Sequence, residues 1–514
     1  MKEIIRRCTA AGLIAPLAFL PALPSQSQPL QADQSSSAQS PQPTIHDYVQ
    51  KSYEELFALA PTLTINAADV ERERQALKNT ENSCRRKFKD HSKTYGKQLD
   101  SARKELKKSS AKLKDEPRHA LHCQIQNLEL LRSEADILSE KAIPNAYDNL
   151  DAKLNLLLQW PEQNRQAQAA IASESYTQRR WADVKDIGFR EIASGQKDDI
   201  KRGQDAVNEL KRTGLLPPEV DNKAVRDYVK TVADRVAQHS DLKVPLNITV
   251  LQSKEINAFA LPGGYLFIER GLLEAVEDEA QLAGVISHEL AHVTARHGAK
   301  LMKRATIAGI FYQAAQIAAV VLTGGVAGIG LYYALQYGYY GLGLVLNLKL
   351  LGISRDYELE ADQLGVQYAW SAGYDASGFI RFFDKMATKE GYVNGVSWFH
   401  THPPFYERMV EAQREIMFLP QGADQIVQTT EFLKMKEDLA SVVAEARKEE
   451  ANAPSLLLTK EEGCAPPEKI EYKPGQPIDQ ICSAEPLAAD STGDAGSAST
   501  CKGDETSNLV AISK

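Results

Sequence analysis

One short motif in this 514-residue chain combines residue types that bind metal ions and move protons. His288-Glu289-Leu290-Ala291-His292 has the form H-E-x-x-H and lies in an apolar run that is typical of a helix. Its spacing puts both imidazoles on one helical face, about one turn apart, where two ring nitrogens reach one ion. Glu289 would lie beside that ion, take a proton from bound water and later give it to a leaving amine. We expect His288 and His292 to be metal ligands and Glu289 to be the general base.

A catalytic zinc site needs a third protein ligand as well as an open position for water. The continuation H-x-x-G-x-x-H would place Gly at position 295 and His at position 298, but the chain has Ala295 and Gly298 there. His297 is one residue short of that pattern, and we interpret it as a residue that caps or decorates the helix end.

A later acidic stretch, Ser354 to Asp362, offers the missing carboxylate. Glu358 and Asp362 are four residues apart and share one face of a helix. Glu358 can bind zinc, while Asp362 accepts the free N–H of a ligand histidine and fixes its tautomer. Glu360 lies on another side of such a helix, and we expect it to be solvated. Arg408 is predicted either to pair with an acid behind the ligands or to lie on the surface.

These motifs resemble the gluzincin metallopeptidase family that includes HtpX, BepA and the CAAX prenyl protease. The resemblance rests on His288 to His292, the later Ser-Arg-x-x-Glu-x-x-Ala-Asp stretch, Thr401-His402-Pro403 and Asn257 to Gly264. It covers roughly residues 215 to 415 and is nearest to the exported BepA-like branch. The resemblance implies that Glu358 is the third ligand of one Zn²⁺ per chain. It also implies that His402 approaches the zinc as a switch ligand or a transition-state donor; a loop histidine held by prolines is the alternative.

The expected reaction is hydrolysis of peptide bonds in extended or misfolded envelope polypeptides, a quality-control role that the resemblance also implies. Zn²⁺ would lower the pKa of bound water towards about 7. The strand that contains Gly264, Tyr265, Leu266 and Phe267 is expected to offer a sheet edge to which an extended substrate adds. One alternative is a chaperone-like or scaffold protein with structural zinc and little proteolysis. Another is a metal-dependent hydrolase of a non-peptide substrate.

The N-terminus has the pattern of a secretory signal peptide. A basic start is followed by Cys8 to Leu23, a stretch without charge. We expect a signal peptide over 1–27, a flexible linker over 28–44, and an exported protein that is periplasmic or associated with the envelope. Export permits disulfides, and we hypothesise that Cys84 and Cys123 staple a helical hairpin.

Residues 45–214 read as a charged helical domain with a coiled-coil hairpin. A helix around 83–114 would pair antiparallel with the helix after Pro117. Segment 71–118 holds 16 Lys and Arg against 8 Asp and Glu. It is either a solvated helix face or a surface for an anionic membrane or a protein partner. The net charge of −8, together with the scarcity of aromatics among these basic residues, where only Phe88 and Tyr95 occur, argues against nucleic acid.

The fold class expected from these patterns is α+β and mostly helical. A zincin-type peptidase domain over 215–450 would carry a small sheet, with strands at 247–251 and 264–268, beside the H-E-x-x-H helix. Residues 451–514 read as a loose, low-complexity tail with cysteines. The charge-free stretch 305–348 is either a buried or site-covering helical loop or a pair of membrane spans. The mean hydropathy of −0.36 excludes a polytopic membrane protein for the chain as a whole.

Overall fold

The computed structural model describes residues 43–109, 115–173, 196–212, 216–302, 355–386, 407–419, 424–452 and 478–483. The described residues from Thr44 onwards belong to one compact unit. The predicted signal peptide, nearly all of the predicted linker, the charge-free stretch 305–348 and His402 lie outside the described residues.

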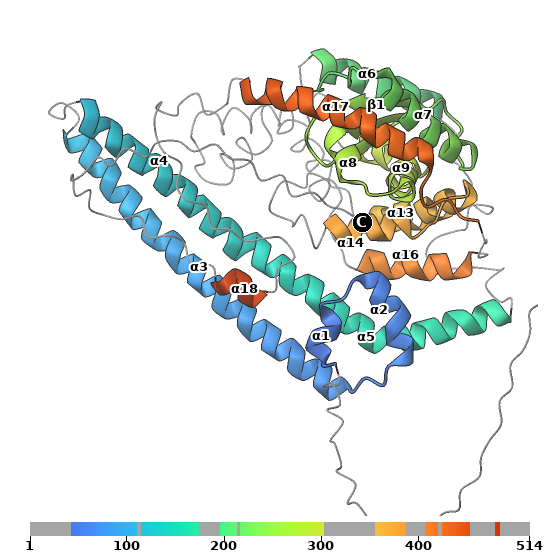
Figure 1. Ribbon diagram of the computed structural model, residues 1–514, viewed down its shortest axis with the longest axis horizontal. Coiled ribbons are helices and arrows are strands. Elements are labelled where there is room, and N and C mark those ends of the chain that lie inside the picture. Colours follow the sequence, from blue (N-terminus) through green and yellow to red (C-terminus); the bar gives the residue numbers. More distant parts are fainter. Residues whose placement is uncertain are drawn as a thin grey trace, which may run out of the picture. The chain divides into compact units, whose positions relative to one another are not determined.

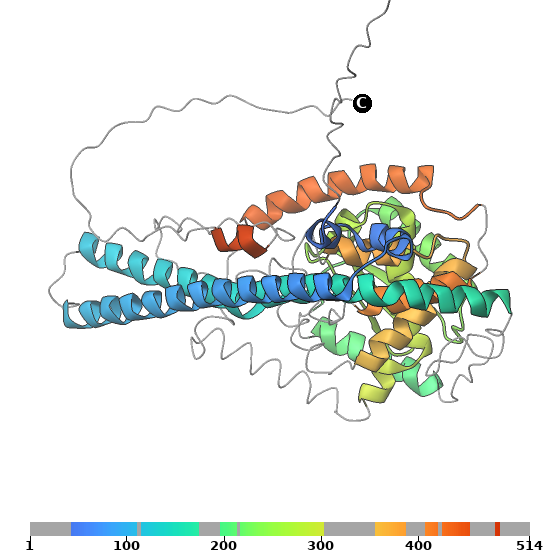
Figure 2. The ribbon, with the colours of Figure 1, turned by 90° about the horizontal axis from the view of Figure 1, so that it is seen from below.

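An antiparallel hairpin of two long helices dominates the N-terminal half (Figure 1). Two short helices precede it, α1 (Ile45–Val49) and α2 (Tyr53–Leu59), and each begins with a capping box. The turn η1 (Ala60–Thr62) leads into α3 (Ala67–Ser109), and α4 (Asp115–Ile137) returns beside α3, as Figure 2 also shows. Apolar side chains of both helices form the seam: Tyr95, Leu99, Ala102, Leu121, Leu128, Leu131 and Ala135. The predicted hairpin is confirmed.

A π-helical turn, η2 (Leu138–Ala142), joins α4 to α5 (Ile143–Ala172). Pro144 lies in the first turn of α5, where its ring would clash with the carbonyl four residues earlier in a regular helix. That carbonyl belongs to Glu140, which lies in η2. The wider π-helical turn avoids the clash and lets the helix continue. Trp160 of α5 is buried, and its Nε1 donates to the carbonyl of Phe57 at 3.0 Å.

The peptidase region consists of helices around a small sheet. In chain order its elements are α6 (Gln196–Arg212), α7 (Lys223–Gln238), β1 (Asn247–Leu251), β2 (Ala258–Leu261), β3 (Tyr265–Glu269), α8 (Arg270–Ala275), α9 (Glu279–Thr294), α10 (His297–Met302), α13 (Arg355–Ser371), α14 (Gly378–Lys385), α16 (Glu407–Phe418) and α17 (Thr430–Asn452). This arrangement confirms the mostly helical α+β class. Among the described helices, none is both long enough and apolar enough to cross a bilayer.

The described sheet has the strand order β1-β3-β2. β3 pairs parallel with β1 and antiparallel with β2, so it is the central strand. The prediction that Gly264, Tyr265, Leu266 and Phe267 form a substrate edge is therefore wrong. Both sides of β3 already carry main-chain partners. Among the described strands, β2 is an edge strand, and a short turn joins it to β3.

The turn from β2 to β3 requires glycine. Gly263 and Gly264 have φ values of 81° and 90°, which side chains disfavour. A Cβ on Gly263 would also lie 2.4 Å from the Cα of Ile200 in α6. This close approach brings α6 onto the sheet, where Ala206, Val207 and Leu210 pack against Phe259 and Phe267.

Helix α9 lies on the other side of the sheet and is buried along its whole length. α13 packs closely against it: a Cβ on Gly365 would lie 3.0 Å from the Cα of His288. The helical domain meets this region through α2, where the backbone N–H of Tyr53 donates to Asp384 of α14 at 3.2 Å. The close approach at Gly365 sets the spacing between α9 and α13.

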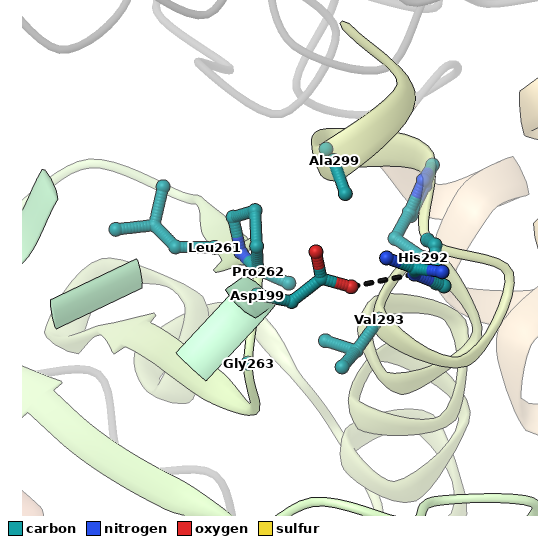
Figure 3. A pocket seen from close by; sticks show the side chains of 10 residues that line it. Asp199, Leu261, Pro262, Gly263, His292, Val293 and Ala299 are labelled. Atoms are coloured by element: carbon teal, nitrogen blue, oxygen red, sulfur yellow. Dashed lines mark hydrogen bonds and ion pairs between the residues drawn. The ribbon is translucent and has the colours of Figure 1, made fainter. Parts of the chain in front are cut away.

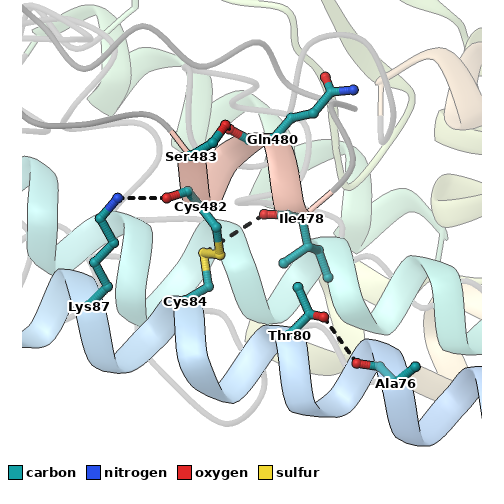
Figure 4. Close-up of a disulfide and its surroundings, with 8 residues drawn as sticks. All are labelled: Ala76, Thr80, Cys84, Lys87, Ile478, Gln480, Cys482 and Ser483. Carbon is teal, nitrogen blue, oxygen red and sulfur yellow. Dashed lines mark hydrogen bonds between the residues drawn. A yellow bond between two sulfur atoms is a disulfide. The ribbon is translucent and has the colours of Figure 1, made fainter.

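A disulfide joins Cys84 of α3 to Cys482 of α18 (Ile478–Ser483), as Figure 4 shows. The hypothesis of a Cys84–Cys123 staple is wrong, and Cys123 is itself in a disulfide. The prediction of a loose tail also fails for α18, because Ile478 and Ile481 are buried in the core. Cysteine spacing does not determine connectivity, and these two partners are 398 residues apart.

Candidate metal centre

Three of the predicted site residues converge between α9 and α13. The Nε2 atoms of His288 and His292 lie 3.0 Å apart. Glu358 Oε2 lies 3.6 Å from His288 Nε2, and Glu358 Oε1 lies 3.5 Å from His292 Nε2. One ligand atom from each residue falls within 4.8 Å of the others, and all three side chains are buried.

Asp362 lies behind His288. Its Oδ1 is 2.9 Å from His288 Nδ1. An ionised carboxylate has no proton to donate, so this short contact favours a neutral ring that carries its proton on Nδ1 and its lone pair on Nε2. The His288 ring also stacks on Phe379, with ring centroids 5.2 Å apart. His288 therefore presents a lone pair towards His292 and Glu358.

Arg408, which the sequence left open as a surface residue, is fully buried among these carboxylates. Its Nε and Nη2 donate to the two oxygens of Asp362 at 2.6 and 2.7 Å, and its Nη1 lies 2.9 Å from Glu358 Oε2. Burial alone would lower the pKa of the guanidinium, but Asp362 and Glu358 outweigh this effect and hold the pKa above its usual value. Arg408 thus stays charged and fixes both acids.

Glu289 is 1% exposed and follows His288 on α9. Its charge adds to those that raise the pKa of Arg408, so it belongs to the same buried electrostatic cluster. The cluster therefore contains both the proposed general base and the carboxylates around the histidines.

The donor set fits a zinc ion. Two imidazole nitrogens and one carboxylate oxygen are a common protein ligand set for catalytic zinc. With ordinary charges, Glu289, Glu358, Asp362 and Arg408 sum to −2, and buried charge of this kind requires compensation. A divalent cation supplies it.

A pocket opens beside His292, between the end of β2 and the end of α9 (Figure 3). Leu261, Pro262 and Gly263 line it from the β2–β3 turn, and Val293 and Ala299 line it from α9 and α10. Asp199 of α6 also lines the pocket, and its Oδ2 accepts from Arg296 Nε at 2.5 Å. The pocket therefore leaves room for a bound group next to His292, a proposed metal ligand.

Two residues were misjudged from the sequence. His297, expected to decorate a helix end, is 1% exposed, and its Nδ1 lies 2.9 Å from His292 Nδ1. Glu360, expected to be solvated, lies 2.9 Å from His297 Nε2 through its Oε2. The missed signal is a turn: Arg296 adopts a φ of 59°, which directs the chain and His297 back towards the site.

The fold and the converging residues define a zincin-type metallopeptidase domain. Residues 223–416 match the family described as Peptidase family M48. The predicted resemblance to gluzincins of the BepA-like branch is confirmed.

Curated relatives match part of the chain. The beta-barrel assembly-enhancing protease of Escherichia coli (strain K12) is 27% identical over 202 residues, covering 38% of this chain and 40% of that protein. The protein of the same name from Yersinia pestis is 26% identical over 204 residues, with the same coverage of 38% and 40%. Mitochondrial metalloendopeptidase OMA1 of Schizosaccharomyces pombe is 32% identical over 187 residues, covering 35% of this chain and 50% of that protein. The chain thus spans half or less of the length of these relatives.

Proposed function

We propose that this chain is a zinc-dependent endopeptidase. The observation that carries the proposal is the convergence of His288, His292 and Glu358 within 4.8 Å in a buried, acidic cluster that also holds Glu289. A structural zinc site has no need of a general base beside its ligands, so Glu289 favours catalysis over the scaffold alternative. The M48 domain and the names of its relatives support the same conclusion.

His288, His292 and Glu358 would hold the ion, which when bound supplies Lewis acidity to a water molecule and to the scissile carbonyl. The other residues act around it. Asp362 holds the His288 ring through Nδ1, and Arg408 holds Glu358 and Asp362 in place. Glu289 takes the proton from the attacking water and returns it to the leaving nitrogen.

The proposed substrate is an extended segment of polypeptide. β2 is the sheet edge beside the pocket next to His292, and a strand added there would gain main-chain hydrogen bonds. This contact recognises backbone more than a particular side chain. It suits an enzyme that removes unfolded or misassembled proteins of the cell envelope.

Export is the proposed route to that substrate. The basic start and apolar run at the N-terminus support it, and the Cys84–Cys482 disulfide is typical of an oxidising compartment. Mass spectrometry of the mature protein tests the proposal, since an intact Met1 would contradict cleavage near residue 27.

His402 is proposed to act at the fourth position around the ion, either as a resting ligand or as a donor to the transition state. The variant His402→Ala separates the two roles. Loss of a resting ligand raises kcat, whereas loss of a donor lowers kcat with little change in KM. An unchanged kcat would place His402 outside the reaction.

The hairpin offers a surface for an acidic partner. Near its tip, α3 exposes Lys97, Arg103, Lys104, Lys107 and Lys108. We propose contact with an anionic membrane surface, whose attraction falls with added salt. Sedimentation with anionic and with neutral lipid vesicles tests this contact, and equal binding to both would leave only a solvated helix face.

The decisive experiment compares Glu289→Gln with the wild type on an unfolded protein substrate. The variant should retain zinc while proteolysis falls by about 10²- to 10⁴-fold, because only the proton acceptor is removed. Glu437→Gln makes the same substitution at an exposed site and serves as the control. Full activity of Glu289→Gln would remove the assignment.

A further inference from the structure

A chain of three side chains leads from α13 through α10 to the site. Glu360 Oε2 lies 2.9 Å from His297 Nε2, and His297 Nδ1 lies 2.9 Å from His292 Nδ1. At its far side, His292 Nε2 faces His288 and Glu358. His297 thus uses both ring nitrogens, one towards a carboxylate and one towards a proposed ligand.

The carboxylate fixes the direction of these hydrogen bonds. Glu360 can only accept, so His297 donates from Nε2. A neutral imidazole then has its lone pair on Nδ1, and His292 must donate to it from its own Nδ1. The remaining lone pair of His292 is therefore on Nε2, the atom that faces Glu358.

The surroundings hold His297 in this place. Arg296, with its left-handed φ of 59°, is tied to Asp199 of α6 by an ion pair at 2.5 Å, which supports a backbone conformation that a side chain disfavours. The His297 ring stacks on Tyr357, with centroids 4.4 Å apart and planes inclined by 13°. A turn fixed by α6 and an aromatic surface from α13 thus orient one ring.

We propose that His297 and Glu360 are positioning residues that set the tautomer and orientation of His292 for metal binding, a proposal that rests on the metal centre of the proposed function. The two histidines of the motif are then held in different ways. His288 is held by a carboxylate directly, through Asp362. His292 is held by a carboxylate acting through a second imidazole. Partners of this kind orient metal-bound histidines and raise their basicity.

Zinc affinity of the full-length protein tests the proposal without an activity assay. The metal-stripped protein competes for zinc with a chromophoric chelator, and unfolding of the metal-free form is followed in parallel. His297→Ala and Glu360→Ala should each weaken zinc binding by about 10- to 100-fold. His297→Asn keeps an acceptor near Nδ1, and Glu360→Gln keeps an acceptor for Nε2, so both should recover most of that loss. Asp356→Ala removes an exposed acid from the same helix and is the control.

The outcomes separate this proposal from the proposed function. If the wild type binds no zinc, the metal centre itself is refuted and the positioning role with it. If the wild type binds zinc and both alanine variants bind it equally well, only the positioning role is refuted. Should His297→Ala fail to fold, the pair Glu360→Ala and Glu360→Gln decides, because Glu360 is partly exposed and its loss leaves no large cavity. Equal zinc affinity in that pair would overturn the proposal.

Discussion

Arg408 Nη1 lies 2.9 Å from Oε2 of Glu358, the carboxylate whose oxygens also face both imidazoles of the H-E-x-x-H motif. The cation comes from α16 and the acid from α13, so packing between these two helices fixes the orientation of a proposed ligand. The same guanidinium binds Asp362 through two hydrogen bonds. One buried arginine thus couples the proposed ligand to the acid behind His288.

Removing this cation should destabilise the metal-free protein strongly. Arg408→Met leaves two buried carboxylates without their partner, and we expect a loss of about 3–5 kcal/mol in the free energy of unfolding. Bound zinc should restore part of that loss. Denaturant unfolding with and without zinc measures both effects. Arg414→Met on the same helix breaks a partly exposed pair with Glu411 and should cost less than about 1 kcal/mol. Equal effects of the two substitutions would contradict the coupling.

Gly365 should tolerate no side chain. A Cβ there would lie 3.0 Å from the backbone N and Cα of His288, so Gly365→Ala must push α13 away from α9. We expect a loss of about 1–3 kcal/mol in stability together with weaker zinc binding. Gly96→Ala in α3 is the matched control, because its Cβ meets only the end of the Arg132 side chain at 3.6 Å. That substitution should stabilise the protein by about 0.5–1 kcal/mol.

Glu269 should make stability fall as the pH rises. Burial raises the pKa of its carboxyl from 4.5 to about 8, although Ser253 and Asn257 oppose the shift by hydrogen bonding. Between these pH values the folded protein holds a proton that the unfolded chain has lost, so this group contributes stability below pH 4.5 that is lost as the pH rises towards 8. The slope from this one group approaches about −1.4 kcal/mol per pH unit.

Glu269→Gln removes this dependence. The variant should match the wild type near pH 5 and exceed it near pH 8, because the amide carries no charge to bury. Denaturant midpoints of both proteins across this range test the expectation. Parallel curves for the two proteins would mean that Glu269 stays ionised throughout.

The disulfide between Cys84 and Cys482 should be worth about 2–5 kcal/mol of stability. Cys482→Ser should lose this amount and free α18 from α3. In the wild type, a reducing agent should reproduce the loss, whereas in the variant it should add only the effect of reducing the disulfide of Cys123. Peptide mapping under non-reducing conditions checks the pairing, and a peptide that links Cys84 to Cys123 would refute it.

The core of the site was predictable because its signal is local. His288 and His292 lie on one helix, and Glu358 and Asp362 lie on another, so helical spacing alone puts each pair on one face. The role of Arg408 was left open because it depends on how α16 packs on α13, which spacing does not encode.

The errors have similar physical causes. His297 reaches His292 only because Arg296 takes a left-handed conformation. An arginine does not predict such a turn. β1 pairs parallel with β3, although β2 lies between them in the sequence. Spacing along the chain does not predict this order, so the central strand was mistaken for an edge. The hairpin, β1 and β3 were predicted well, whereas β2 was not among the expected strands.

The bond between Cys84 and Cys482 closes most of the chain into a covalent ring. A single break of the backbone anywhere inside that ring, whether by self-digestion or by another protease, leaves one molecule whose mass differs from the intact protein only by the water added. Such a nicked molecule would migrate as a single band until its disulfides are reduced and would then separate into two pieces. Purity judged without reductant therefore says nothing about whether the peptide chain inside the ring is whole.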